Sequence, residues 1–319
     1  MAWNGRGRRS RGRRRAAGLL IGFLADAALG DPRRGHPVAG FGVLASRLER
    51  TTYRDARLAG AVHVALLVGG TVALGRVLGR GGVPATALAT WVVLGGTSLT
   101  REGGALAAEI DAGDLSAARR RLPSLCGRDP ASLDGAGMAR AGTESVAENT
   151  SDAVVAPLFW GAVAGVPGLL GYRAVNTLDA MIGHRSPRHA RFGWAAARLD
   201  DVANLLPARL CALLTALVAP VVGGSPRAAL AAWRRDARAH PSPNAGPVEA
   251  AAAGALGVTL GGRTVYAHGV EERPRLGSGP APDPGDLRRA VRLSRLVAAA
   301  AAVGAAAACA AAPVRGDEG

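Results

Sequence analysis

The chain has 319 residues and a formal net charge of +15, because 39 basic side chains outweigh 24 acidic ones. All 39 basic residues are arginines, which excludes a P-loop lysine, a Schiff-base lysine and a lysine general base. The three cysteines, Cys126, Cys211 and Cys309, are too far apart in sequence for a CxxC metal site and too few for a disulfide framework.

The N-terminus combines a basic tail with an apolar run. Seven arginines and no acids stand in residues 1–15, so we expect a basic tail followed by one domain over residues 16–319. Surfaces that bind nucleic acid interleave aromatic and basic residues, and aromatics make up only 4% here. We therefore expect no nucleic-acid partner and predict that the tail lies against anionic lipid.

The first apolar run covers residues 16–29 and is interrupted only by Asp26. It imitates a secretory signal, but the motif-like residues Gly30, Asp31 and Pro32 follow at once. We expect an uncleaved first membrane segment, with Asp26, Asp31 and His36 near the membrane border as functional candidates.

Further charge-free runs favour a membrane protein. Several approach the roughly 20 residues that a helix needs to cross a bilayer, and such runs are difficult to bury together in one globular core. They predict an all-α, multi-pass helical bundle in the cell membrane with polar catalytic loops, although a large soluble protein with alanine-rich core helices is the alternative. The runs are residues 58–75, 81–100, 153–172, 210–225 and 296–314.

The third run has an unusual composition for a membrane helix. Pro157, Pro167 and four glycines interrupt it, which is poor material for one straight helix. A continuous span would also place the polar clusters before and after it on opposite faces of the membrane. We therefore predict a broken or re-entrant element.

The densest polar cluster is the segment ESVAENTSD, which begins at Glu144. Glu144 and Glu148 are four residues apart and share a helix face, which suits a divalent cation or a basic partner. Asn149 and Asp152 add oxygen ligands. The alternative is a helix end, with Asp152 as a cap and Glu144 paired with Arg140.

A second cluster, between residues 173 and 204, mixes arginines with carboxylates. This mixture suits magnesium-bound phosphate, because acids hold the metal and arginine forks hold phosphate oxygens. A charged helix at the membrane surface with internal salt bridges is the alternative. The members are Arg173, Asn176, Asp179, Arg185, Arg198, Asp200 and Asp201.

The last polar segments lie in the C-terminal third of the chain. Two prolines flank Ser242 and stiffen a loop that would present His240, Ser242 and Asn244, unless the loop is a simple connector. Residues 271–285 are rich in proline and glycine and predict an exposed loop. Residues 286–295 predict a basic helix that leads into the final apolar run.

Together these segments resemble the CobD/CbiB family of cobalamin biosynthesis proteins, the membrane-bound adenosylcobinamide-phosphate synthases. They follow the family's order and cover most of residues 18–300. The resemblance is carried by LADAALGDPRRGHPV from Leu24, GRDPASLD from Gly127, ESVAENTSDAVVAPLFW from Glu144, YRAVNTLDAMIGHR from Tyr172, RFGWAAARLDDVANLLPARL from Arg191, HPSPNAG from His240 and GALGVTLGG from Gly254.

The resemblance implies that ATP drives an amide bond between a propionate carboxylate of adenosylcobyric acid and aminopropanol or aminopropanol phosphate. A carboxylate must be activated before an amine attacks it, and an acyl phosphate made from ATP with Mg²⁺ is the expected route. The expected partners are these substrates, the lipid bilayer and other membrane enzymes of the corrinoid pathway.

The resemblance also suggests roles for the polar residues. We expect catalytic roles for Glu144, Glu148, Asp179 and Asp201, and metal binding by Glu148, Asn149, Asp152 and Asp200. Substrate contacts are expected from Asp31, His36, Arg173, Asn176, Arg185, Arg198, His240, Ser242 and Asn244.

Two other functions stay open at this point. The patterns Asn176-x-x-Asp179 and Asp200-Asp201-x-x-Asn204 loosely imitate the magnesium-diphosphate motifs of membrane prenyl- and phosphotransferases, which normally pack more apolar spans around them. A transporter or non-catalytic membrane scaffold would account for broken helices and Asp26. It would not need so many oxygen ligands in its polar loops.

Overall fold

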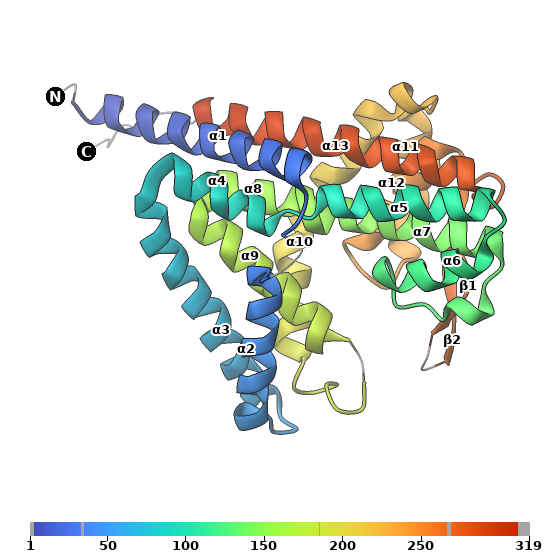
Figure 1. The fold of residues 1–319 in the computed structure, drawn as a ribbon, viewed down its shortest axis with the longest axis horizontal. Coiled ribbons are helices and arrows are strands. Elements are labelled where there is room, and N and C mark those ends of the chain that lie inside the picture. The colour runs from blue at the N-terminus through green and yellow to red at the C-terminus, as the bar shows by residue number, and fades with distance from the viewer. Residues whose placement is uncertain (1–2, 33–34, 185, 267–268, 312–319) are drawn as a thin grey trace. The chain divides into compact units, whose positions relative to one another are not determined.

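The computed structural model describes residues 3–32, 35–184, 186–266 and 269–311, and this part of the chain is predominantly helical, as predicted (Figure 1). It forms two compact units that alternate along the sequence. Unit 1 comprises the described residues of 1–95, 156–203 and 301–319, and unit 2 comprises residues 96–155 and 204–300.

Unit 1 contains six complete α-helices among the described residues, together with residues 194–203 of α10 and the end of α13. Its core includes Val64, Leu67, Leu178 and Phe192. The helices are α1 (Trp3–Leu29), α2 (Pro37–Thr52), α3 (Arg57–Leu78), α4 (Gly82–Val93), α8 (Ala156–Ala164) and α9 (Val166–Leu178), and a π-helix follows at Asp179–Gly183.

Small residues let α1 and α4 pack closely. Gly18 and Gly22 stand four residues apart on α1, and a Cβ at either position would overlap Thr86 or Thr90 of α4. Both threonine hydroxyls donate to carbonyls one turn earlier in α4, so their methyl groups can face the glycines. This arrangement is the small-xxx-small packing common between membrane helices.

The run at residues 153–172 is broken, as predicted. Helix α8 ends at Ala164, Gly165 takes a positive φ of 67°, and α9 begins at Val166 with a proline in its first turn. Gly168 of α9 packs against the carbonyl of Trp160, so α8 and α9 form a helical hairpin within unit 1.

Residues 3–15 of the predicted basic tail form the beginning of helix α1. Arg15, the last arginine of the tail, donates to the carbonyls of Ala162 (2.9 Å) and Val163 (3.2 Å). These carbonyls lie at the C-terminal end of α8, where a cation is favourable. Arg15 is therefore bound to protein.

Unit 2 is organised around the buried helix α12, whose alanines pack against the surrounding helices. Its elements are α5 (Gly96–Asp111), α6 (Leu115–Arg121), α7 (Gly135–Thr150), a π-helix (Ser151–Val155), α10 (Trp194–Val218) from residue 204, α11 (Pro226–Asp236), α12 (Ala245–Leu256), β1 (Thr259–Tyr266), β2 (Gly269–Gly277) and α13 (Pro284–Ala311) up to residue 300.

Strands β1 and β2 form an antiparallel hairpin that the sequence analysis did not predict. Leu260 pairs with Leu276, and both side chains are fully buried. The predicted exposed loop at residues 271–285 is therefore wrong for its first half, which belongs to β2. Pro274 is tolerated there because each strand of a two-stranded sheet has an open edge.

The described part of the chain contains three helical stretches long and apolar enough to cross a membrane: Arg57–Asp111, Trp194–Val222 and Pro284–Ala311. They include two of the five predicted runs, residues 58–75 and 81–100, and overlap most of two others, residues 210–225 and 296–314. The run at residues 153–172, broken at Gly165, and the first run at residues 16–29 are not among them. Large apolar side chains are exposed along α3 and α10, including Leu58, Leu66, Leu206 and Leu217, which is compatible with membrane association.

The contact between α1 and α4 can be tested with one methyl group. We expect Gly22→Ala to lower the free energy of unfolding by about 1–3 kcal/mol, because the new Cβ overpacks the interface. Gly69→Ala in α3 is the matched control, since open space surrounds Gly69 and alanine favours a helix. Thermal unfolding in detergent measures both variants, and equal midpoints would contradict the packing.

Candidate functional site

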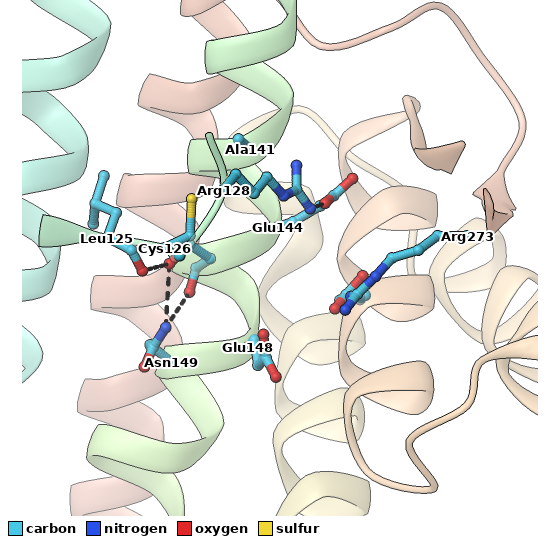
Figure 2. A pocket seen from close by; sticks show the side chains of 11 residues that line it. Leu125, Cys126, Arg128, Ala141, Glu144, Glu148, Asn149 and Arg273 are labelled. Carbon is cyan, nitrogen blue, oxygen red and sulfur yellow. Dashed lines mark hydrogen bonds and ion pairs between the residues drawn. The ribbon is translucent and has the colours of Figure 1, made fainter. Parts of the chain in front are cut away.

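A cavity of about 210 Å³ in unit 2 gathers ionisable side chains from α7, α12, β2 and the loop before α7 (Figure 2). Most of them come from segments that are distant in sequence. The lining residues are Leu125, Cys126, Gly127, Arg128, Ala141, Glu144, Ser145, Glu148, Asn149, Glu249 and Arg273.

A buried ion pair between Arg128 and Glu144 forms one wall of this cavity. Glu144 is 3% exposed and Arg128 is 7% exposed. The second carboxylate oxygen of Glu144 accepts a hydrogen bond of 2.7 Å from the backbone N–H of Gly261, at the bulge in β1. Both oxygens of Glu144 are thus bonded to protein and hold the wall together, and its catalytic role stays a prediction.

The alternative partner for Glu144, Arg140, has a different function. Its guanidinium donates to the carbonyls of Gly261 (2.7 Å) and Arg263 (2.8 Å). Arg140 and Glu144 therefore both attach α7 to strand β1. The two side chains stand four residues apart on α7, and both bond to β1 instead of forming an ion pair with each other.

The guanidinium of Arg128 is only partly hydrogen-bonded within the described residues. Its Nη2 donates to Glu144, whereas its Nη1 is buried and has no hydrogen-bond partner among the described residues. A buried guanidinium nitrogen without an acceptor is costly. Because Arg128 lines the cavity, an acceptor that enters the cavity can satisfy it.

Two further carboxyls, Glu148 of α7 and Glu249 of α12, line the same cavity. Glu249 is only 2% exposed. Burial and the negative charge of Glu148 raise the pKa of Glu249 to about 8, against the opposing effect of Arg273 and Arg128. Burial likewise raises the pKa of Glu148. Each of the two carboxyls therefore holds its proton to a higher pH than an ordinary glutamate does.

His240 stands behind Glu249. Its Nδ1 accepts a hydrogen bond of 3.1 Å from the Ser242 N–H, and its Nε2 lies 3.8 Å from Oε1 of Glu249. Burial lowers the pKa of His240, which favours the neutral ring. With Nδ1 as the acceptor from Ser242, the ring proton is assigned to Nε2, which faces the carboxyl.

The loop around His240 also anchors the first turn of α12. The Ser242 hydroxyl accepts from the N–H groups of Asn244 and Ala245, and Oδ1 of Asn244 accepts a hydrogen bond of 2.9 Å from Arg209. Ser242 and Asn244, predicted to contact substrate, thus hold the helix that carries Glu249.

Arg273 closes the cavity from strand β2. It is paired in register with Gly262 of β1, and Figure 2 shows its side chain reaching toward α7. Its Nε lies 3.6 Å from a carboxylate oxygen of Glu271. The positive charge of Arg273 acts on both cavity carboxyls and on His240.

The predicted metal ligands come from α7, from the π-helix after it and from α10, and their role as ligands stays a prediction. Nδ2 of Asn149 donates to the carbonyl and hydroxyl oxygens of Ser145, and Asp152 lies on the π-helix that follows α7, whereas Asp200 belongs to unit 1. Within the described residues, no three His, Cys, Asp or Glu side chains are grouped so that they could hold a metal ion.

The second predicted cluster belongs to unit 1. Nη1 of Arg173 donates to Oδ1 of Asn176 at 3.4 Å, and Arg198 pairs with Asp201 at 3.3 Å on α10. Asp179 begins a π-helix, a distortion often found at functional sites. Since the cavity belongs to unit 2, a site shared by the two clusters stays a prediction.

The N-terminal candidates also lie in unit 1. Asp31 follows helix α1, and Nδ1 of His36 accepts a hydrogen bond of 3.2 Å from the Val38 N–H, which caps α2. Asp200 lies on α10 beside Asp201. Arg185 lies outside the described residues.

The sequence analysis missed Arg128, Glu249 and Arg273. Glu249 had a usable signal, because it is the only acid or arginine between Arg238 and Arg263 and directly precedes an alanine run. A lone acid in an apolar helix indicates a buried carboxyl. Arg273 had none, because only the hairpin register brings it to the cavity.

Comparison with known proteins agrees with the resemblance in sequence. The model of the CobD/CbiB protein family matches residues 19–294. The chain belongs to the CobD/CbiB family. It is 62% identical over 290 residues to the cobalamin biosynthesis protein CobD of Mycobacterium tuberculosis, covering 89% of this chain and 93% of the relative.

More distant relatives carry the same name. Cobalamin biosynthesis protein CobD of Rhodobacter capsulatus is 46% identical over 295 residues, covering 88% of this chain and 93% of the relative. The protein of that name from Chromobacterium violaceum is 45% identical over 289 residues, covering 86% and 90%. No solved structure matches the chain. The family and these names indicate a role in cobalamin biosynthesis.

The Arg128–Glu144 pair should dominate the stability of the cavity wall. We expect Glu144→Gln to lower the free energy of unfolding by about 3–5 kcal/mol, because it leaves the buried Arg128 charge uncompensated. Arg288→Gln breaks an exposed pair with Asp111 and should cost at most about 1 kcal/mol. Denaturant unfolding compares the two variants, and similar losses would contradict the assigned role.

The carboxyl pair should make stability depend on pH. The folded protein keeps a proton on Glu249 up to about pH 8, whereas an unfolded glutamate loses it near 4.5. Stability therefore falls as pH rises through this interval. We expect Glu249→Gln to lose less stability than wild type between pH 6 and pH 8.5, as measured by thermal unfolding. Glu272→Gln, an exposed control, should follow wild type.

Proposed function

We propose that this protein is an ATP-dependent acid–amine ligase of cobalamin biosynthesis. It would join aminopropanol or aminopropanol phosphate to a propionate carboxylate of adenosylcobyric acid and give adenosylcobinamide or its phosphate. Membership of the CobD/CbiB family supports the pathway. The observation that supports the chemistry is the buried carboxyl pair, Glu148 and Glu249, in the cavity of unit 2.

Amide formation requires a neutral amine, and an alkyl amine is an ammonium ion at neutral pH. The carboxyl pair suits this need, because it attracts an ammonium ion and accepts a proton at a pKa of about 8 on Glu249. The pKa of this base lies close to neutral pH, where a general base is most effective. In our proposal the ammonium proton passes to a carboxylate oxygen of the pair as the nitrogen attacks.

The bonds balance through an acyl phosphate. The propionate oxygen attacks the γ-phosphorus of ATP and ADP leaves. The amine nitrogen then attacks the acyl carbon, the amide C–N bond forms, and inorganic phosphate leaves with the acyl C–O bond electrons. The neutral His240 beside Glu249 fits this scheme, since it would stabilise the carboxylate without adding a competing positive charge.

Mg²⁺ has no ready-made site in the part of the chain that the structure describes. Magnesium commonly binds through one or two carboxylates together with the phosphates of its nucleotide, so the predicted set of four protein ligands is not required. Arg173, Arg198, Asp179, Asp200 and Asp201 stay our candidates for the nucleotide, on unit 1.

The proposal includes a location in the cell membrane. The three long apolar helical stretches and the exposed leucines of α3 and α10 support it. In that setting the substrates and any partner enzymes of the corrinoid pathway would meet the protein at the membrane surface.

The carboxyl pair can be tested by activity. With adenosylcobyric acid, ATP and aminopropanol phosphate, we expect Glu249→Gln and Glu148→Gln to lower kcat by about 10²–10⁴, the usual contribution of a general base. Glu272→Gln, which changes an exposed acid of β2, should keep full activity. Product formation followed by chromatography measures this, and a fully active Glu249→Gln enzyme would remove Glu249 from the mechanism.

The same base predicts the shape of the pH profile. Because the carboxyl must be ionised to accept the proton, wild-type activity should rise with pH and level off above about pH 8. In Glu249→Gln the residual activity should lose this rise. An unchanged profile in the variant would show that another group sets the pH dependence.

A further inference from the structure

The cavity of unit 2 offers two guanidinium groups as well as two carboxyls. We propose that Arg128 and Arg273 form the subsite for the phosphate of a small phosphorylated amine, whose ammonium group lies against Glu148 and Glu249. Naming that amine as the ligase substrate rests on the proposed function. The phosphate subsite itself rests only on the geometry of the cavity.

Arg128 provides the strongest argument, because its guanidinium is fixed in position and one of its nitrogens lacks a hydrogen-bond acceptor among the described residues. Glu144 fixes one end of its guanidinium, and the Gly261 N–H fixes Glu144 in turn. The other terminal nitrogen, Nη1, is buried in the wall of the cavity without a hydrogen-bond partner among the described residues. A phosphate oxygen would supply the missing acceptor as a charge-assisted hydrogen bond.

Arg273 reaches the cavity from a different element. It stands on β2, whereas Arg128 precedes α7, so an anion between them would be contacted from two walls (Figure 2). Arginine is the residue best suited to this task, since its planar fork matches the oxygens of a phosphate. The hairpin holds Arg273 in place through its pairing with β1.

The two carboxyls make the cavity selective. An inorganic anion alone would gain from the arginines but would be repelled by any negative charge on Glu148 and Glu249. A molecule with a phosphate at one end and an ammonium group a few bonds away meets both charges with their opposites. Charge complementarity of this kind contributes more to the specificity of binding than to its affinity.

The volume of the cavity further limits which ligands can bind in it. Its volume of about 210 Å³ exceeds that of a few waters and is smaller than a drug-sized pocket of about 300–1,000 Å³. A phosphorylated amino alcohol fits this volume, whereas a corrinoid or a whole nucleotide does not. The terminal phosphate of a nucleotide has the same chemistry as the phosphate of the amine, so an experiment has to separate the two.

Titration calorimetry on the full-length protein in detergent tests the subsite with four probes: aminopropanol phosphate, aminopropanol, inorganic phosphate and ATP. We expect aminopropanol phosphate to bind at least 10-fold more tightly than aminopropanol, and inorganic phosphate to compete with it. Arg273→Gln should weaken binding of aminopropanol phosphate at least 10-fold and leave binding of ATP unchanged. Arg275→Gln, an exposed arginine on the same strand, is the matched control.

Arg128 needs a milder change, because its removal exposes the Glu144 charge in the wall. Arg128→Lys keeps a positive charge for Glu144 and loses the fork, so it should fold and bind aminopropanol phosphate more weakly. A thermal midpoint close to that of wild type confirms folding. In the activity assay both variants should raise KM for the phosphorylated amine more than they lower kcat.

Two results would overturn the subsite. Unchanged binding of aminopropanol phosphate by a folded Arg273→Gln protein would exclude Arg273, and loss of ATP binding alone would assign both arginines to the nucleotide. Failure of the proposed function looks different: aminopropanol phosphate would bind through the arginines while no ligase product forms with any amine. That result would support the subsite and reject the reaction.

Discussion

The structure of unit 2 depends on one buried ion pair, between Arg128 and Glu144. Glu144 binds a guanidinium with one oxygen and the backbone N–H of Gly261 with the other, so a single carboxylate joins the loop before α7 to the bulge of β1. A buried pair is costly to form and far more costly to break, because either partner alone would be an uncompensated charge. The interaction therefore fixes which elements form the cavity more than it adds to overall stability.

The chemistry of the cavity follows from that wall. Because the pair attaches α7 to the hairpin, Glu148 is held one turn further along α7, and the hairpin carries Arg273 to the opposite side. Helix α12 completes the arrangement, since the His240 loop anchors its first turn and places the buried Glu249 in the wall of the cavity. Burial then raises the pKa of both carboxyls, and the negative charge of Glu148 adds to the shift at Glu249, whose pKa of about 8 suits it to accept a proton near neutral pH.

Sequence reasoning found the residue types of the site but assigned several of them to different tasks. The spacing of Glu144 and Glu148 predicted one helix face correctly, yet it could not show that Glu144 is occupied by Arg128 while Glu148 is open to the cavity. The HPSPN loop was recognised as stiff, and the structure shows its serine bonded to the first turn of α12 and its asparagine bonded to Arg209. A charged residue that pairs with a distant part of the chain cannot be distinguished, from sequence alone, from a charged residue that binds a ligand.

The sequence by itself determined the helical class, the break between α8 and α9 and the family. These properties are carried by local composition, such as charge-free runs and prolines, and by contiguous motifs. Only the tertiary structure decided that Glu249 and Arg273 join Glu148, that a hairpin replaces an expected loop, and that the polar clusters belong to two units. The physical reason is that pKa, burial and partner choice depend on distances through space between residues more than 100 positions apart in the chain.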